Sequence, residues 1–276
     1  PGKMVLSIHQ TTSRNAGYQG SLEGWAKAGI KYVEIESGAL DGFLKTETIE
    51  TARKVITDLG LTPVSGAAVL ADIWIPGTAR AASLETWKKR CEQFAGLGLR
   101  KIYCPSITNR KVTADDFKAT PEAIRESGDI AKSFNLTAMI EFARTSTHLA
   151  TLSSALTMIR EANHPNVRPM LDCFHFWSGW SKFEDLDMLK PGELAHVHFQ
   201  DILDTPRELI DNNGRVIPGD GVAPLVKILQ KLKEKQYAGP LSVELFLARL
   251  TGGDAQATGA EIKQKCDAVM QKAGVV

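Results

Sequence analysis

The chain has 276 residues, of which 43% are hydrophobic, so it can bury the core of one large α/β domain. Its 33 basic and 32 acidic residues leave a formal charge of +1, which gives no electrostatic reason to expect a nucleic-acid or membrane partner. The four cysteines, at positions 91, 104, 173 and 266, form no Cys-x-x-Cys pair, which argues against a zinc ribbon or a disulfide scaffold.

Strand-like and helix-like segments alternate along the whole chain. Eight segments have the length and the buried or alternating pattern of strands: 4–9, 31–36, 63–69, 101–107, 136–142, 167–172, 194–200 and 240–246. Helical segments are predicted at 22–28, 46–59, 84–97, 114–134, 150–162, 222–235 and 257–272, with a short segment near 183–189. Pro121 leaves open whether 114–134 is one helix or two. Long loops are expected at 71–82 and 201–221.

This alternation predicts a (β/α)8 TIM barrel with parallel strands, formed as a single domain over residues 1–276. Glycines at 29, 60, 98 and 239 separate helices from the strands that follow them. A doubly wound open sheet is the alternative fold. It is disfavoured because no Gly-x-Gly-x-x-Gly follows the first strand and no Gly-x-x-x-x-Gly-Lys loop occurs.

The last four predicted strands each end with one potential metal ligand, in the order Glu141, Asp172, His198 and Glu244. The carboxyl ends of barrel strands meet at one mouth, so these four side chains would converge there. Acidic side chains are seldom buried unless they are paired, and three carboxylates with one imidazole suit Mn, Zn, Co, Mg or Fe(II). We therefore predict one divalent metal ion, against the alternative of four solvated strand ends.

Other residues near the predicted mouth are candidates for supporting roles. His9 ends the first strand and Trp74 lies in the loop 71–82, so both are candidates to bind substrate, although core packing would also explain Trp74. His196 shares strand parity with His198 and is expected one layer lower, as a core histidine or a support for a ligand. Asp201 is a candidate acceptor for a ligand imidazole, with a solvated loop acid as the alternative.

Four motifs near the carboxyl ends of the last strands identify a family. They are Asp172-Cys-Phe-His175-Phe, His196-Val-His198, Arg215-Val-Ile-Pro218-Gly219-Asp-Gly221 and Ser242-Val-Glu244-Leu-Phe. Together they resemble the xylose-isomerase-like barrel superfamily of sugar isomerases, ketose 3-epimerases and endonuclease IV, and within it the inosose (2-keto-myo-inositol) isomerases. The resemblance covers nearly the whole chain. It implies that the four predicted ligands are the metal ligands of the family and that His175 and Arg215 bind substrate.

Two departures from the superfamily narrow the choice of activity. Ketose 3-epimerases carry a further glutamate six residues after the first metal ligand, where this chain has Thr147. Endonuclease IV uses extra histidines near the ends of earlier strands, and segments 65–69 and 103–105 contain none. The neutral charge also disfavours a DNA-repair enzyme.

The resemblance predicts a divalent-metal-dependent sugar isomerase or epimerase acting on an inosose or another polyhydroxylated ketone. Glu141 and Glu244 would act as paired acid and base around a cis-enediolate. The alternatives are a lyase that cleaves a 3-keto-glycoside by the same enolisation and a catalytically silent sugar-binding barrel. We expect a small sugar or cyclitol as partner, and the sequence leaves a homo-oligomer open. A cytoplasmic location is expected, or a periplasmic one if a leader was removed ahead of Pro1.

Overall fold

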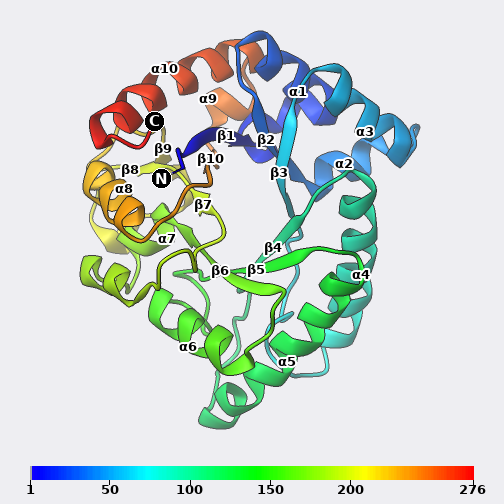
Figure 1. Ribbon diagram of the computed structural model, residues 1–276, viewed down its shortest axis with the longest axis vertical. Helices are drawn as coiled ribbons and strands as arrows, with labels where there is room; N and C mark the ends of the chain where they lie inside the picture. The colour runs from blue at the N-terminus through cyan, green and yellow to red at the C-terminus, as the bar shows by residue number, and fades with distance from the viewer. Residues whose placement is uncertain (1) are drawn as a thin grey trace.

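The computed structural model describes residues 2–276, and eight parallel strands close into one barrel in it (Figure 1). The strands are β1 (Val5–His9), β2 (Tyr32–Glu36), β3 (Thr62–Ala67), β4 (Lys101–Pro105), β5 (Thr137–Glu141), β6 (Val167–Asp172), β7 (Val197–His198) and β10 (Pro240–Val243). Neighbouring barrel strands follow one another along the chain, and β10 pairs with β1 to close the ring. The predicted (β/α)8 barrel is confirmed.

Helices form the outer ring of the barrel and turn their apolar faces toward the strands (Figure 1). The longer ones are α1 (Gly17–Lys27), α3 (Ile49–Asp58), α4 (Arg80–Gly96), α5 (Ala114–Ser133), α6 (Leu152–Ala162), α8 (Leu225–Glu234) and α10 (Ala255–Ala273). Shorter pieces are α2 (Ser37–Phe43), α7 (Cys173–Ser178), α9 (Ala248–Thr251), η1 (Gln10–Ala16), η2 (Phe183–Met188), η3 (Arg207–Leu209) and η4 (Asn212–Gly214). In α8 the buried residues Leu225, Ile228, Leu229 and Leu232 fall at helical spacing.

Helix α5 is continuous through Pro121, which answers the question that the sequence left open. Proline has no N–H and so removes one helical hydrogen bond. The helix is stabilised elsewhere by a capping box between Thr113 and Asp116 and by a buried face that includes Ile124 and Ala131. Packing on the barrel therefore outweighs the local cost of the proline.

The segment expected to be a long loop, 201–221, contains a small antiparallel sheet of β8 (Asp201–Ile202) and β9 (Arg215–Val216). The Asp201 carboxylate accepts hydrogen bonds from the backbone N–H groups of Ile202, Gly219 and Ala223. Asp201 thus fixes the base of this segment, and the expected role as acceptor for a ligand imidazole is wrong. The same contacts place Arg215 on ordered β-structure.

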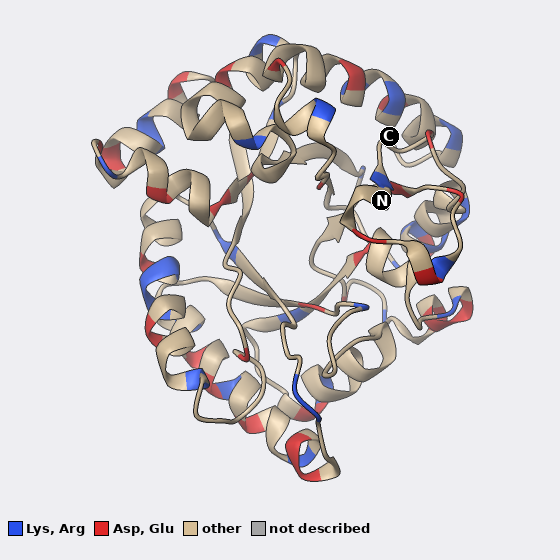
Figure 2. Cartoon of the chain, turned by 180° about the vertical axis from the view of Figure 1, so that it is seen from behind, with Lys and Arg blue, Asp and Glu red and all other residues tan. Residues whose placement is uncertain are grey.

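Side chains inside the barrel lie in layers, as is usual for this fold. Met139 and Met170 precede Glu141 and Asp172 by two residues, so they point inward one layer below those acids, in a buried cluster with Ala67, Tyr103 and Ala195. On the outside, basic and acidic residues are interspersed along the helices (Figure 2). None of the helices in the described part of the chain has the length and apolar character that crossing a bilayer requires.

A tight approach between β3 and α4 yields a stability prediction. A Cβ atom on Gly66 would lie 2.6 Å from Cε2 of the fully buried Phe94 ring. We expect Gly66→Ala to lower the free energy of unfolding by about 1–3 kcal/mol, because the ring has no space to yield. Gly42→Ala is the control, since no atom lies within 4 Å of a Cβ there. Urea and thermal unfolding midpoints test this, and equal midpoints for Gly66→Ala and wild type would contradict it.

Candidate metal centre

The structure brings Glu141, Asp172, His198 and Glu244 together at the carboxyl-terminal mouth of the barrel. The first three are the last residues of β5, β6 and β7, and Glu244 directly follows β10. Each offers one ligand atom such that all four atoms lie within 4.8 Å of one another, and all four side chains are buried. This convergence follows from the barrel, because each strand ends at the same level of the mouth.

The donor set fits a divalent cation. His198 Nε2 hydrogen-bonds Oε1 of Glu34 at 3.0 Å, so in the neutral ring that nitrogen carries the proton and Nδ1 has the lone pair for an ion. Nδ1 lies 2.7 Å from Oε2 of Glu141, yet neither atom has a hydrogen-bond partner of good geometry within residues 2–276. A bound ion would provide a partner for both of these buried polar atoms.

Two groups of this cluster, Glu141 and His198, have raised pKa values, whereas the pKa values of Asp172 and Glu244 are lowered. Burial raises the pKa of Glu141 to about 8, with His198 opposing the shift and Asp172 and Glu244 adding to it. Burial alone would lower the pKa of His198, but the carboxylates of Glu34, Glu244 and Glu141 outweigh it and raise that pKa well above its usual value. Both shifts show that the cluster favours additional positive charge.

Glu34 is a site residue that the sequence analysis missed. It lies on β2, fully buried, and its second oxygen is 3.1 Å from Nε2 of His196. His196 therefore occupies the lower layer that strand parity predicted, where it lies beside Glu34, and with His198 these two residues form a second group that could hold a metal ion. Glu34 could have been found from its position between two apolar residues, Val33 and Ile35, on a barrel strand. Side chains alternate along a strand, so the acid points into the barrel when its neighbours point outward.

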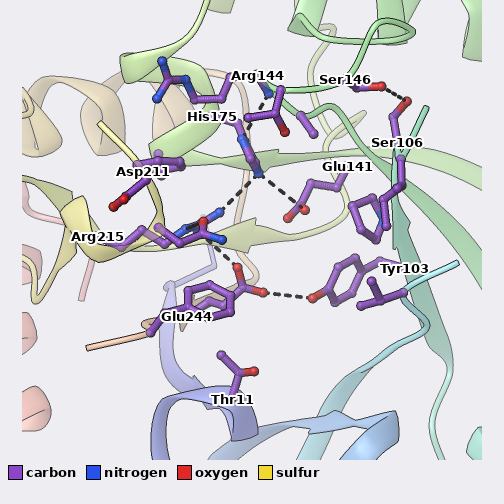
Figure 3. A pocket seen from close by; sticks show the side chains of 18 of the residues that line it. Thr11, Tyr103, Ser106, Glu141, Arg144, Ser146, His175, Asp211, Arg215 and Glu244 are labelled. Carbon is purple, nitrogen blue, oxygen red and sulfur yellow. Dashed lines mark hydrogen bonds and ion pairs between the residues drawn. The ribbon is translucent and has the colours of Figure 1, made fainter. Parts of the chain in front are cut away.

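A cavity of ≈ 610 Å³ opens at this mouth, and two of the four predicted ligands, Glu141 and Glu244, line it. The predicted substrate-binding residues His175 and Arg215 line it as well (Figure 3), and so does His9. The cavity is also lined by residues that the sequence analysis did not assign, among them Tyr103, Arg144, Phe174 and Phe246. Its wall combines aromatic faces with hydroxyl, amide and guanidinium groups, a composition suited to a polar small molecule.

Arg215 contacts both the cavity and two of the predicted ligands. Its Nη1 lies 2.8 Å from Oδ2 of Asp172 and 3.1 Å from Oε1 of Glu244. The guanidinium carbon lies 4.3 Å from the centroid of the Phe174 ring, and Nε donates to Asn212. The sequence indicated a substrate contact for this arginine but not its ion pairs with the acids.

His175 lines the cavity, and each of its ring nitrogens lies beside a donor. Its Nδ1 accepts the backbone N–H of Arg144 at 3.1 Å, and the guanidinium of Arg215, which can only donate, faces Nε2. Burial lowers the pKa of His175 to about 4, which keeps the ring neutral at pH 7. Nε2 lies 3.9 Å from Oε1 of Glu141 and 3.2 Å from Nη2 of Arg215 (Figure 3). His175 and Arg215 thus lie side by side at one region of the cavity, where both can contact a substrate oxygen.

Trp74 does not reach the cavity. It is buried, its indole N–H donates to the Cys104 carbonyl at 3.1 Å, and its ring packs edge-on against Trp87. The predicted substrate contact of Trp74 is therefore wrong, and core packing, the alternative explanation, describes its position in the structure. The loop that carries it folds back onto α4 and α5, and the Arg80 side chain binds the Ile73 carbonyl there.

Comparisons with known proteins agree with the fold. A model of the xylose isomerase-like TIM barrel family matches residues 22–267. An inosose isomerase from Halalkalibacterium halodurans is 28% identical over 251 residues, 88% of each chain, and a D-psicose 3-epimerase from Agrobacterium fabrum is 26% identical over 254 residues, 88% of this chain and 82% of the relative. A crystal structure of the IolI protein with a zinc atom has a TM-score of 0.90 at 24% identity, covering 98% of this chain and 99% of that one. Because the family model spans most of the sequence, this chain belongs to the xylose isomerase-like TIM barrel family.

Proposed function

We propose that this chain is a divalent-metal-dependent isomerase or epimerase of a polyhydroxylated ketone, such as an inosose or a keto-sugar. The observation that carries the proposal is the convergence of three carboxylates and one imidazole at the floor of a cavity lined by polar donors. Relatives named inosose isomerase and D-psicose 3-epimerase support the class of reaction.

Glu141, Asp172, His198 and Glu244 would hold the ion. A bound divalent ion in such a site supplies Lewis acidity, which acidifies the C–H next to a carbonyl. Mn, Zn, Co, Mg and Fe(II) all suit this donor set. A zinc atom in the related IolI structure makes zinc the first ion to test.

Two of the glutamates that line the cavity, Glu141 and Glu244, would move the proton. One carboxylate accepts the proton from the carbon beside the ketone, which leaves a cis-enediolate. The other returns a proton to the neighbouring carbon, or to the opposite face of the same carbon, and so gives an isomer or an epimer. His175 and Arg215 would hold the substrate oxygens, since both line the cavity and the guanidinium presents a planar fork of donors.

Exchange of substrate protons with solvent tests the proposal. We expect the ion-loaded protein to catalyse deuterium exchange at the carbon next to the ketone of at least one inosose or ketohexose. Chelator treatment should abolish exchange and lower the thermal midpoint, because an ion that binds only the folded state stabilises it. NMR in D₂O and differential scanning fluorimetry provide the measurements.

Other outcomes of that experiment assign other functions. Release of the leaving group from a 3-keto-glucoside would identify the lyase, which uses the same enolisation. Uptake of an ion without exchange on any ketone would indicate a sugar-binding barrel. Failure to bind any divalent ion would contradict the proposed function altogether.

The paired glutamates give a second prediction. Glu141→Gln and Glu244→Gln should each lower kcat by about 10²- to 10⁴-fold, because an amide cannot accept the proton. The change preserves side-chain size, so the fold should remain. Glu36→Gln is the control: this residue lies at the rim of the same cavity, but its oxygens accept the N–H groups of Gly38 and Ala39. Turnover close to wild type in both site variants would rule out acid–base catalysis by the pair.

A third prediction concerns Arg215. Arg215→Ala and Arg215→Lys should both reduce kcat/KM, since neither offers the planar fork, while zinc remains bound through the four ligands. The lysine variant keeps a charge beside Asp172 and Glu244 and should therefore lose less stability than the alanine variant. Arg207→Ala is the control, because its side chain lies over Trp177 and does not line the cavity. If kcat/KM falls only in proportion to lost metal, Arg215 does not bind substrate.

A further inference from the structure

His9, Tyr103 and Glu244 form a triangle of polar contacts beside the proposed metal site. His9 Nε2 lies 2.8 Å from the Tyr103 hydroxyl, the hydroxyl lies 3.0 Å from Oε2 of Glu244, and His9 Nε2 lies 3.3 Å from the same oxygen. Figure 3 shows the bond between Tyr103 and Glu244 at the cavity wall. The three side chains come from β1, β4 and the end of β10, and all are buried.

The chemistry of the imidazole ring sets the direction of these hydrogen bonds. His9 Nδ1 accepts the backbone N–H of Thr11 at 3.1 Å, so a neutral ring carries its proton on Nε2. Nε2–H then donates to the Tyr103 oxygen, which leaves the phenol proton free to donate to Glu244 Oε2. Both ring nitrogens of His9 are therefore engaged with the protein, although the ring lines the cavity.

The two glutamates of the site are held differently. In Glu244, Oε2 accepts from Tyr103 and Oε1 lies 3.1 Å from Nη1 of Arg215, so each oxygen faces a donor. In Glu141, Oε2 has no hydrogen-bond partner among the described residues, and Oε1 is 3.9 Å from the nearest imidazole nitrogen of His175. Carboxylate torsions are broad and roughly two-fold, so donors at both oxygens are needed to fix one orientation.

We propose that Tyr103, oriented by His9, is a positioning residue that fixes the rotation of the Glu244 carboxylate in the metal site. The proposal rests on the metal site of the proposed function and adds a role that the four ligands alone do not imply. The phenol ring also packs edge-on against the His198 imidazole, with centroids 4.8 Å apart at 81°. One side chain thus contacts two of the four ligands, through its hydroxyl and through its ring.

Replacing Tyr103 by phenylalanine removes the hydroxyl and keeps the ring on His198. We expect Tyr103→Phe to weaken zinc binding by about 10- to 100-fold, the usual effect of losing a hydrogen-bond partner of a metal ligand. Competition with a chromophoric chelator measures this on the purified full chain with zinc alone, without any substrate. In turnover assays we expect kcat to fall and KM to change little, because the hydroxyl acts on Glu244 and not on the substrate.

Tyr18→Phe is the matched control. The Tyr18 hydroxyl is also buried and donates to a protein oxygen, the Ala52 carbonyl at 2.8 Å, but it does not line the cavity. Each phenylalanine variant loses the hydrogen bond that the hydroxyl donates, and Tyr103→Phe also loses the one accepted from His9, so both metal-free variants should show a lower thermal midpoint. Only Tyr103→Phe should change the zinc affinity.

Variants of His9 test the order of the three residues. Glutamine can place an N–H group near the position of Nε2, so His9→Gln should retain most of the zinc affinity, whereas His9→Leu should weaken it as Tyr103→Phe does. The double variant Tyr103→Phe with His9→Leu should bind zinc no more weakly than Tyr103→Phe alone, because His9 acts through the hydroxyl. Additive losses would overturn that order.

The outcomes separate this inference from the proposed function. Wild-type zinc binding with unchanged affinity in Tyr103→Phe would overturn the positioning role and leave the proposed function intact. An equal loss of zinc affinity in Tyr18→Phe would also overturn it, since the effect would then be one of general stability. Absence of zinc binding by the wild-type chain would overturn both.

Discussion

The constraint on which the site depends is the burial of three carboxylates within 4.8 Å of one another. Water cannot screen their repulsion there, so each requires N–H or O–H donors or positive charge from its surroundings. Asp172 receives the backbone N–H of His175, the amide of Gln200 and Nη1 of Arg215. Glu244 forms an ion pair with Arg215 and accepts a hydrogen bond from the Tyr103 hydroxyl.

Glu141 has the fewest donors of the three carboxylates, and this difference governs the chemistry of the cavity. Its pKa is raised to about 8 by burial and neighbouring acids, whereas His198 and Arg215 outweigh burial at Glu244 and lower its pKa. A fourth carboxylate, Glu34, has a separate role below the mouth, because it binds Nε2 of His198 and so directs Nδ1 upward. The region between Glu141 and His198 is therefore where a cation would relieve the most unfavourable charge.

The sequence revealed the parts of the site that adjoin apolar runs. Glu141, Asp172, His198 and Glu244 could be predicted because each follows several buried residues and the barrel brings strand ends together. Residues whose role depends on a partner from another strand could not be assigned. Tyr103 was read as part of a strand, and its contacts with His9 and Glu244 join positions separated by 94 and 141 residues.

Errors at Trp74 and Asp201 have a common physical cause. Both follow barrel strands and were assigned to the mouth by position along the chain, but backbone groups nearby offered them closer partners. The indole of Trp74 binds the Cys104 carbonyl, and the carboxylate of Asp201 binds three backbone N–H groups. Position after a strand places a residue near the mouth, whereas competition from local backbone hydrogen bonds decides which way its side chain turns.

Arg215 connects the electrostatics of the site to the kind of substrate it suits. Asp201 fixes the base of the hairpin that carries this arginine, and two aromatic rings, Phe174 and Phe246, flank its guanidinium. The positive fork is thereby held beside Asp172 and Glu244. Its Nη2 lies 3.2 Å from Nε2 of His175, so the two side chains present polar groups to one region of the cavity. A ligand that places one oxygen there and a neighbouring oxygen on an ion held by the three carboxylates and His198 would satisfy both groups at once, which is why we propose a hydroxy-ketone and not an apolar or singly oxygenated molecule.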